Sequence, residues 1–221
     1  MKKYLIIILL FSLSIGHAEN YITDYIVIID QLFHMEYTKV RMDVYKNDVL
    51  MKYYEMDCYR KDHKVRMDFT GPAVEKGRRM LDDESNIWMY MPRTSKIMKL
   101  PLKQSFMGSD ASNRDVFRLK FGHEYNLVNT TPADQKITIL ELKAKDQSVA
   151  YSKVLIWFDE ENRVPLKQEM YTLSGKKIKT ATYSENKIMD GRLIPTVMII
   201  VDELQKKHIY PSGILYHPIL Q

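Results

Sequence analysis

The chain has 221 residues, with 33 Lys and Arg, 28 Asp and Glu, and a formal net charge of +5 at pH 7. The two signs of charge are interspersed rather than grouped in blocks, which argues against a nucleic-acid partner. A single cysteine, Cys58, excludes an internal disulfide, and this length suits one domain with a core large enough to fold without cross-links.

The first eighteen residues have the pattern of a secretory signal peptide. Lys2 and Lys3 form a short positive region, residues 4–13 are an apolar run, and Gly16 and Ala18 are small residues at the positions that a signal peptidase reads. The run is about half of the roughly twenty residues that a membrane-spanning helix needs. We therefore expect cleavage after Ala18 and export to the periplasm. No cysteine lies at the cleavage point, so no lipid attachment is expected there.

A helix is expected at the start of the remaining chain. Apolar residues recur there at three- and four-residue spacing, as on one face of a helix. Thr23 or Asp24 can cap the first turn. The broad apolar stripe must contact other apolar residues, either by packing on a sheet or as a lid over a cavity. Its members are Ile22, Tyr25, Ile26, Ile29, Leu32 and Phe33, widened by Val27 and Ile28.

After this helix the apolar period changes to two, which is typical of β-strands. Short segments of this kind follow one another about every ten residues with turn residues between them, a spacing typical of an antiparallel sandwich or barrel. No internal repeat or low-complexity segment divides the chain. The expected strands are Lys39–Val44, Leu50–Tyr59, Lys64–Phe69, Ile87–Met91, Lys96–Leu100, Lys136–Lys143, Tyr151–Phe158, Pro165–Leu173, Ile178–Ser184 and Leu193–Val201.

Residues 101–121 depart from this pattern and predict a long loop followed by a short helix, and long loops in compact domains are frequently functional. Phe106 and Met107 can cover the mouth of a cavity, with Gly108 as the hinge. Alternatively the turn packs on the sheet, and Ser109 or Asp110 caps the following helix. The two roles are compatible, and Asp110 is the favoured cap.

Two segments carry a resemblance to a known family. The sequence Trp-x-Tyr-x-Pro at 88–92, followed by Ser-Phe-Met-Gly-Ser-Asp at 105–110, resembles the signature of the outer-membrane lipoprotein-sorting proteins. This is the superfamily of the periplasmic lipoprotein carrier LolA. The resemblance covers roughly residues 20–203, with further matching segments at 151–154, 157, 165–166, 190–192 and 194–196.

The resemblance implies a mainly β fold with some helix. It implies a half-open, curved antiparallel barrel of about eleven strands, with an N-terminal helix and a helical loop covering the concave face. The expected domain spans residues 19–204 and is followed by an atypical tail at 205–221. Pro211 and Pro218 argue against a full edge strand in this tail, so the sequence leaves open whether the tail completes the barrel.

The resemblance also implies a function, since relatives carry lipoprotein acyl chains across the periplasm and some are associated with exporters. We expect a periplasmic protein, with outer-membrane association left open, that binds acyl chains of lipids or lipoproteins in an apolar cavity. An inner-membrane transporter or exporter is the expected protein partner, and the protein itself is expected to be a monomer. The alternative is a non-enzymatic accessory module of an exporter, or a surface adhesin, with a self-filled core.

The candidate ligand-binding residues come from the signature and the later strands. The strand Ile87–Met91 is apolar on both faces, which indicates burial on both sides. One face can point into a hollow, or the strand can be an ordinary core strand. Arg93 and Lys96 at the following turn are candidates for a head-group or partner contact, or are solvated turn charges. The cavity or lid candidates are Trp88, Tyr90, Met98, Phe106, Met107 and Trp157.

No catalytic or metal-binding pattern is apparent, so we expect neither an enzyme nor a cofactor. The six histidines show no metal-ligand spacing, and the sequence has no Gly-x-Ser-x-Gly elbow or phosphate-binding loop. Cys58 lies in a strand pattern and is expected to be a small buried residue rather than a nucleophile. A hydrolase that uses Ser109 or Asp110 is the remaining enzymatic hypothesis.

Overall fold

The computed structural model describes residues 25–32, 35–46, 49–117, 121–147, 149–189 and 191–204, together with the backbone of 214–218. The predicted signal peptide lies outside these residues, so its cleavage site remains a prediction. Among the helices of the described part, none is long and apolar enough to cross a membrane.

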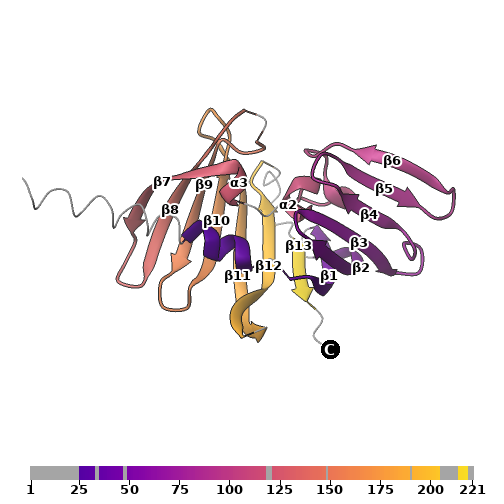
Figure 1. The fold of residues 1–221 in the computed structure, drawn as a ribbon, viewed down its shortest axis with the longest axis horizontal. Coiled ribbons are helices and arrows are strands. Elements are labelled where there is room, and N and C mark those ends of the chain that lie inside the picture. Colours follow the sequence, from indigo (N-terminus) through magenta and orange to yellow (C-terminus); the bar gives the residue numbers. More distant parts are fainter. Residues whose placement is uncertain are drawn as a thin grey trace, which may run out of the picture.

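Thirteen strands of the described chain form one curved antiparallel sheet (Figure 1). The first half of the sheet runs from β6 to β1 and the second half from β12 to β7, with β13 between them. This architecture confirms the predicted fold class, with two strands more than the resemblance implies. The strands are β1 (Tyr37–Lys46), β2 (Val49–Lys61), β3 (Lys64–Gly71), β4 (Arg79–Asp82), β5 (Ile87–Met91), β6 (Lys96–Leu100), β7 (Tyr125–Pro132), β8 (Ile137–Ala144), β9 (Lys153–Asp159), β10 (Val164–Tyr171), β11 (Lys177–Met189), β12 (Arg192–Asp202) and β13 (Ile214–Pro218).

The C-terminal segment occupies the middle of the sheet. β13 pairs with Val40–Val44 of β1 and with Met198–Ile200 of β12, and so joins the two halves. The sequence argued against a full edge strand in this tail, and residues 214–218 instead form a short central strand. Pro218 is the last residue of β13, opposite Val40, and a strand end tolerates the missing N–H better than a strand centre does.

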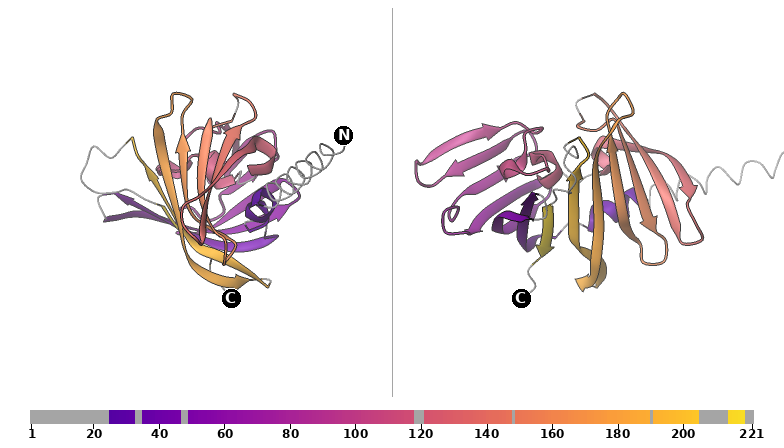
Figure 2. Two further views of the ribbon diagram at one scale, coloured as in Figure 1. Left: turned by 90° about the vertical axis from the view of Figure 1, so that its left-hand side faces the viewer. Right: turned by 180° about the vertical axis from the view of Figure 1, so that it is seen from behind.

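Alternation along each strand separates an inner face from an outer face. In β3, Val65, Met67 and Phe69 are buried, whereas Lys64 and Arg66 are exposed. This is the alternation that the sequence predicts for that segment. The buried side chains of both halves form one large core cluster on the inner face, where the helical segments also lie (Figures 1 and 2).

The helical segment at residues 25–32 packs on the inner face of the second half. The Tyr25 ring meets Phe158 edge to face, with centroids 5.3 Å apart. At the other end, Leu32 is buried with Val164 and Ile194. Of the two roles that the sequence left open for this helix, packing on the sheet is the one observed.

A second set of helical turns follows β6 and comprises η1 (Phe106–Gly108), α2 (Asn113–Phe117) and α3 (Phe121–Glu124). The cap of α2 is Ser112, whose hydroxyl accepts the Asp115 N–H at 3.3 Å while Asp115 Oδ2 accepts the Ser112 N–H at 2.7 Å. The predicted caps are therefore wrong, because the helix begins after them. Asp110 instead accepts the Asp202 N–H at 3.3 Å, and Ser109 donates to the Phe106 carbonyl.

Asp115 anchors α2 to the second half of the sheet. Its carboxylate accepts a hydrogen bond from the Tyr151 hydroxyl at 2.5 Å and contacts Lys179 Nζ at 2.5 Å. All three side chains are buried. Burial, and then the neighbouring carboxylate, raise the pKa of Tyr151, so its hydroxyl remains a hydrogen-bond donor at neutral pH.

The Lys179→Met substitution should destabilise the protein strongly. It leaves the buried Asp115 charge without its cation, which typically costs about 3–5 kcal/mol. The double substitution Asp115→Asn with Lys179→Met removes both charges and should recover much of that loss. Urea denaturation measures the free energy of unfolding, with exposed Lys176→Met as the control, expected within about 0.5 kcal/mol of wild type. Equal stability of Lys179→Met and Lys176→Met would contradict the anchoring role.

Candidate functional site

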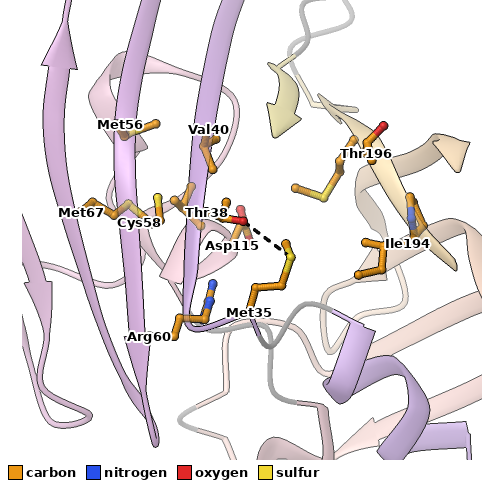
Figure 3. Close-up of a pocket in the computed structure, with 13 residues that line it drawn as sticks. Met35, Thr38, Val40, Met56, Cys58, Arg60, Met67, Asp115, Ile194 and Thr196 are labelled. Carbon is orange, nitrogen blue, oxygen red and sulfur yellow. Dashed lines mark hydrogen bonds between the residues drawn. The ribbon is translucent and has the colours of Figure 1, made fainter. Parts of the chain in front are cut away.

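An apolar cavity of about 120 Å³ lies on the inner face, where the two halves of the sheet meet (Figure 3). One wall consists of side chains from the first half, including Val40 on β1, Met56 on β2 and Met67 on β3. Ile194 and Met198 of β12 belong to the opposite wall. The arrangement can enclose hydrocarbon between two walls that belong to different halves.

The cavity exists because the strands at this junction differ in length. β13 pairs with β12 only as far as Met198 and with β1 only as far as Val40. The remaining parts of these two longer strands, Ile194–Val197 and Tyr37–Lys39, have no strand between them in the described chain. The two halves of the sheet therefore separate at this end, and side chains do not completely fill the space on the inner face.

Soft sulfur-containing side chains make up much of the lining. Met35, Met56, Met67 and Met198 all face the cavity, together with the Cys58 thiol. Methionine has an unbranched, polarisable side chain that adapts to apolar partners of different shape. The lining can thus rearrange around a ligand at a smaller cost than a lining of branched side chains.

Two charged side chains, Arg60 and Asp115, belong to this lining. Arg60 of β2 lines the cavity and also a neighbouring polar cleft of about 340 Å³, so its guanidinium lies between the apolar and polar spaces. Burial lowers the pKa of Arg60, but an arginine remains charged at neutral pH. Asp115 also lines the cavity and a second, small pocket of about 40 Å³. The site therefore combines a mostly apolar lining with one cation, Arg60, and one carboxylate, Asp115.

The aromatic candidates of the predicted site lie on the outer face, so the prediction that they line a cavity is wrong. Trp88 is opposite Leu81 and Lys99, and Tyr90 is opposite Arg79. The neighbouring residue Ile87 is fully buried on the inner face. Because this strand is apolar on both faces, its sequence could not indicate which face points inward.

Trp157 also lies on the outer face. Its ring is opposite Lys167 in the register of β9 and β10, and Lys167 Nζ lies 3.9 Å from the ring centroid. The neighbouring residues Ile156 and Phe158 are buried in the core. Trp157 is therefore a cation–π partner of Lys167 rather than part of the cavity wall.

The loop candidates contribute to the core instead of the cavity lining. Phe106 is fully buried and meets Phe117 edge to face at 6.1 Å, and Met107 is half-buried with its sulfur 3.4 Å from the Arg78 guanidinium. Gly108 has a φ of 77°, which favours glycine, while its role as a hinge remains a prediction. Met98 on β6 is 39% exposed.

Arg93 and Lys96 are exposed at the turn between β5 and β6. Neither lines the cavity, so a contact between these cations and a ligand held there is not supported. They are solvated turn charges in the described chain, as the second interpretation of the sequence expected. A role in binding a partner remains a prediction.

Sequence reasoning missed the residues that line the cavity. The methionines at positions 56 and 67 were assigned to strands, but the pattern alone did not distinguish filled core from cavity wall. A signal was present in β2, where Tyr54, Met56, Cys58 and Arg60 share the inward phase. A cation at an inward position marks the place where the apolar interior ends.

The open curved sheet, with helices and a cavity on its inner face, defines a LolA-like protein. Three of the most similar solved structures have this fold. A LolA superfamily protein from Nitrosomonas europaea is 27% identical, with 88% of this chain and 90% of that chain covered and a TM-score of 0.74. The resemblance noted from the sequence is thereby confirmed.

The other two structures support the fold alone. A DUF1329 family protein from Desulfovibrio piger is 20% identical, with 90% of each chain covered and a TM-score of 0.73. An outer membrane lipoprotein-sorting protein domain from Vibrio parahaemolyticus is 18% identical, with 90% of each chain covered and a TM-score of 0.69.

A family model described as an uncharacterized protein matches residues 61–209, and the chain belongs to this family. The comparison with curated proteins gives no match.

Cys58 should react slowly with a thiol reagent in the folded protein. Burial raises the pKa of its thiol to about 12, and only the thiolate is the nucleophile. At pH 8 we expect DTNB to react at least about 100-fold more slowly with the native protein than with the urea-unfolded protein. The absorbance of the released thiolate measures both rates for this single cysteine. Equal rates would show that the cavity wall opens freely to solvent.

Proposed function

We propose that this protein binds the acyl chain of a lipid or lipoprotein in the cavity between β1 and β12 and acts as a periplasmic carrier. The observation that carries the proposal is the methionine-lined apolar cavity with Arg60 at its rim. The LolA-like fold and the signal-peptide pattern of the first eighteen residues support it. Binding by burial of hydrocarbon needs no catalytic group, and the proposal includes none.

The size of the cavity limits what the described conformation can hold. At about 120 Å³ it is close to an apolar cavity of about 150 Å³ that binds benzene in another protein. Ordinary ligand pockets have volumes of about 300 Å³ or more. A short hydrocarbon segment therefore fits directly, and a longer chain requires the methionines or the two walls to move apart.

The rim of the cavity suggests how an amphiphilic ligand is oriented. A carboxylate or phosphate at the end of an acyl chain would meet Arg60, the group that lies between the cavity and the polar cleft. An arginine at this position matches the geometry of both anions. We propose that the tail enters the cavity and that the polar end remains beside Arg60 in the cleft.

A second candidate function follows from the small cavity volume. If the walls do not separate, the core is filled mostly by its own side chains, and the protein is a non-enzymatic accessory module of an exporter or an adhesin. The two candidates differ in one observable property, the uptake of a fatty acid by the purified protein.

The substitution Val40→Phe should weaken the binding of dansyl-labelled undecanoic acid. The larger ring occupies space in the cavity, and excluding two methylenes would lower the affinity about tenfold at roughly 0.8 kcal/mol each. Dansyl fluorescence measures the affinity. Val74→Phe, at a residue that is 57% exposed, is the matched control and should bind as wild type does. If the folded Val40→Phe protein binds with unchanged affinity, the ligand lies elsewhere; if the wild type does not bind, the accessory function is favoured.

The substitution Arg60→Gln should affect charged and neutral ligands differently. Laurate presents a carboxylate to the rim, whereas dodecanol has a hydroxyl at the same position. A hydrogen bond to a charged group contributes about 1.5–3 kcal/mol, so we expect laurate binding to weaken about tenfold or more and dodecanol binding to change little. Competition with the dansyl probe measures both affinities. An equal loss for the two ligands would mean that Arg60 has only a structural role.

A further inference from the structure

The outer face of β4, β5 and β6 has an exposed patch of apolar and aromatic side chains. Leu81 is opposite Trp88 on the neighbouring strand, and Tyr90 is opposite Ile97. Ile97 is 69% exposed and Leu81 is 40% exposed, while the two aromatic rings are half-buried. We call these four residues, together with Arg79 and Lys99 on the same face and Arg93 and Lys96 at the end of the β5–β6 hairpin, the outer patch; Lys96 itself is opposite Met91 and has the inward phase.

The β5–β6 hairpin itself carries charge of one sign. From Ile87 to Ser109 the sequence contains no Asp or Glu but four basic residues, of which Arg93, Lys96 and Lys99 belong to the outer patch. None of these three has an ion-pair partner in the described chain. These cations are thus available to an anionic partner.

Two acidic residues border the outer patch, and each already has a hydrogen-bond or ion-pair partner. Asp83 accepts a hydrogen bond from Trp88 Nε1 at 2.8 Å, which fixes the indole ring on the outer face. Asp68 is paired with Arg66 and lies 4.0 Å from Arg79. Neither carboxylate neutralises the cations of the β5–β6 hairpin.

We propose that the outer patch docks the protein on a bilayer surface that contains anionic phospholipid. Trp and Tyr favour the membrane–water interface, and an exposed Ile97 can enter the acyl boundary as the apolar side chains of interfacial segments do. Each Lys or Arg near an anionic surface strengthens binding about fivefold. The outer patch combines these three features at one edge of the sheet, on β4, β5 and β6.

The dimensions of the patch favour a membrane over a protein partner. β4 has four residues and β5 and β6 have five each; with strands about 4.8 Å apart and about 3.3 Å per residue, they present an area of about 220 Å². A specific protein interface needs about 800 Å² on each side. Lysine is also depleted at protein interfaces, whereas Lys99 is opposite Trp88 within this patch.

The position of the hairpin allows it to reach a flat surface. β6 is the edge strand of the sheet, and β5 and β6 lie at one end of the molecule, away from the second half (Figures 1 and 2). The outer patch and the cavity lie on opposite faces of the sheet. Docking therefore does not depend on a ligand in the cavity, and the two proposals can fail independently.

A flotation assay with two matched variants tests the proposal. The full chain is mixed with vesicles of phosphatidylcholine alone or of an equimolar mixture with phosphatidylglycerol. The variant Lys96→Gln with Ile97→Asn changes the patch, while Lys187→Gln with Ile188→Asn changes an equivalent Lys-Ile pair on β11, where Ile188 is 77% exposed.

Wild type and the β11 variant should bind the anionic vesicles in preference to the neutral ones, and the patch variant should bind about tenfold more weakly. Equal binding by the two variants, or no binding by wild type, would overturn the proposal. In the latter case an acidic protein becomes the candidate partner. Uptake of the dansyl probe by the patch variant should be unchanged, which separates a failure of docking from a failure of acyl-chain binding.

Tryptophan fluorescence identifies the residue that meets the membrane. The chain has two tryptophans, so Trp157→Phe leaves Trp88 as the reporter and Trp88→Phe leaves Trp157. On addition of anionic vesicles, Trp88 emission should shift to shorter wavelength and be quenched by brominated phospholipid. A response from Trp157 instead, or from neither, would overturn the assignment of the outer patch.

Discussion

The buried Asp115 carboxylate is the contact that holds the helical loop against the sheet. It joins α2 to Lys179 of β11 and to Tyr151 before β9, and the same residue lines the cavity. Taking a carboxylate out of water is costly unless cations and donors surround it, so α2 is restricted to the position where those partners meet. The volume of the cavity therefore depends on a polar contact beside it.

The second constraint is the short strand that connects the two halves. β13 joins β1 to β12 over only part of their length, and the sheet parts where this pairing ends. A continuous ladder would place a further strand segment between Thr38 and Thr196 and fill the space there. Apolar side chains of both halves face this opening, and flexible methionines fill it only in part. The cavity is thus a consequence of strand length and side-chain softness together.

The sequence predicted the strands better than it predicted the site. Alternation in Lys64–Phe69 indicated both the strand and its buried face, because one face is charged and the other apolar. In Ile87–Met91 both faces are apolar, so the pattern did not indicate which face is buried. The aromatic residues were therefore assigned to the wrong side. The position of β13 could not be predicted either, since its residues pair with residues about 16 positions away on β12 and about 174 positions away on β1. Contacts this distant leave no local pattern.

The β5 part of the signature that carries the family resemblance does not line the cavity, contrary to what the sequence had led us to expect. In β5, Ile87 and Met89 pack toward the core, while Trp88 and Tyr90 point away from it. One five-residue strand therefore supplies apolar packing to the inner face and an aromatic surface to the outer face. The alternation of a strand makes this division unavoidable. The proposed hydrocarbon site and the proposed docking surface thus lie on opposite faces of one sheet, so a substitution at Trp88 or Tyr90 changes the outer face without changing a residue that lines the cavity.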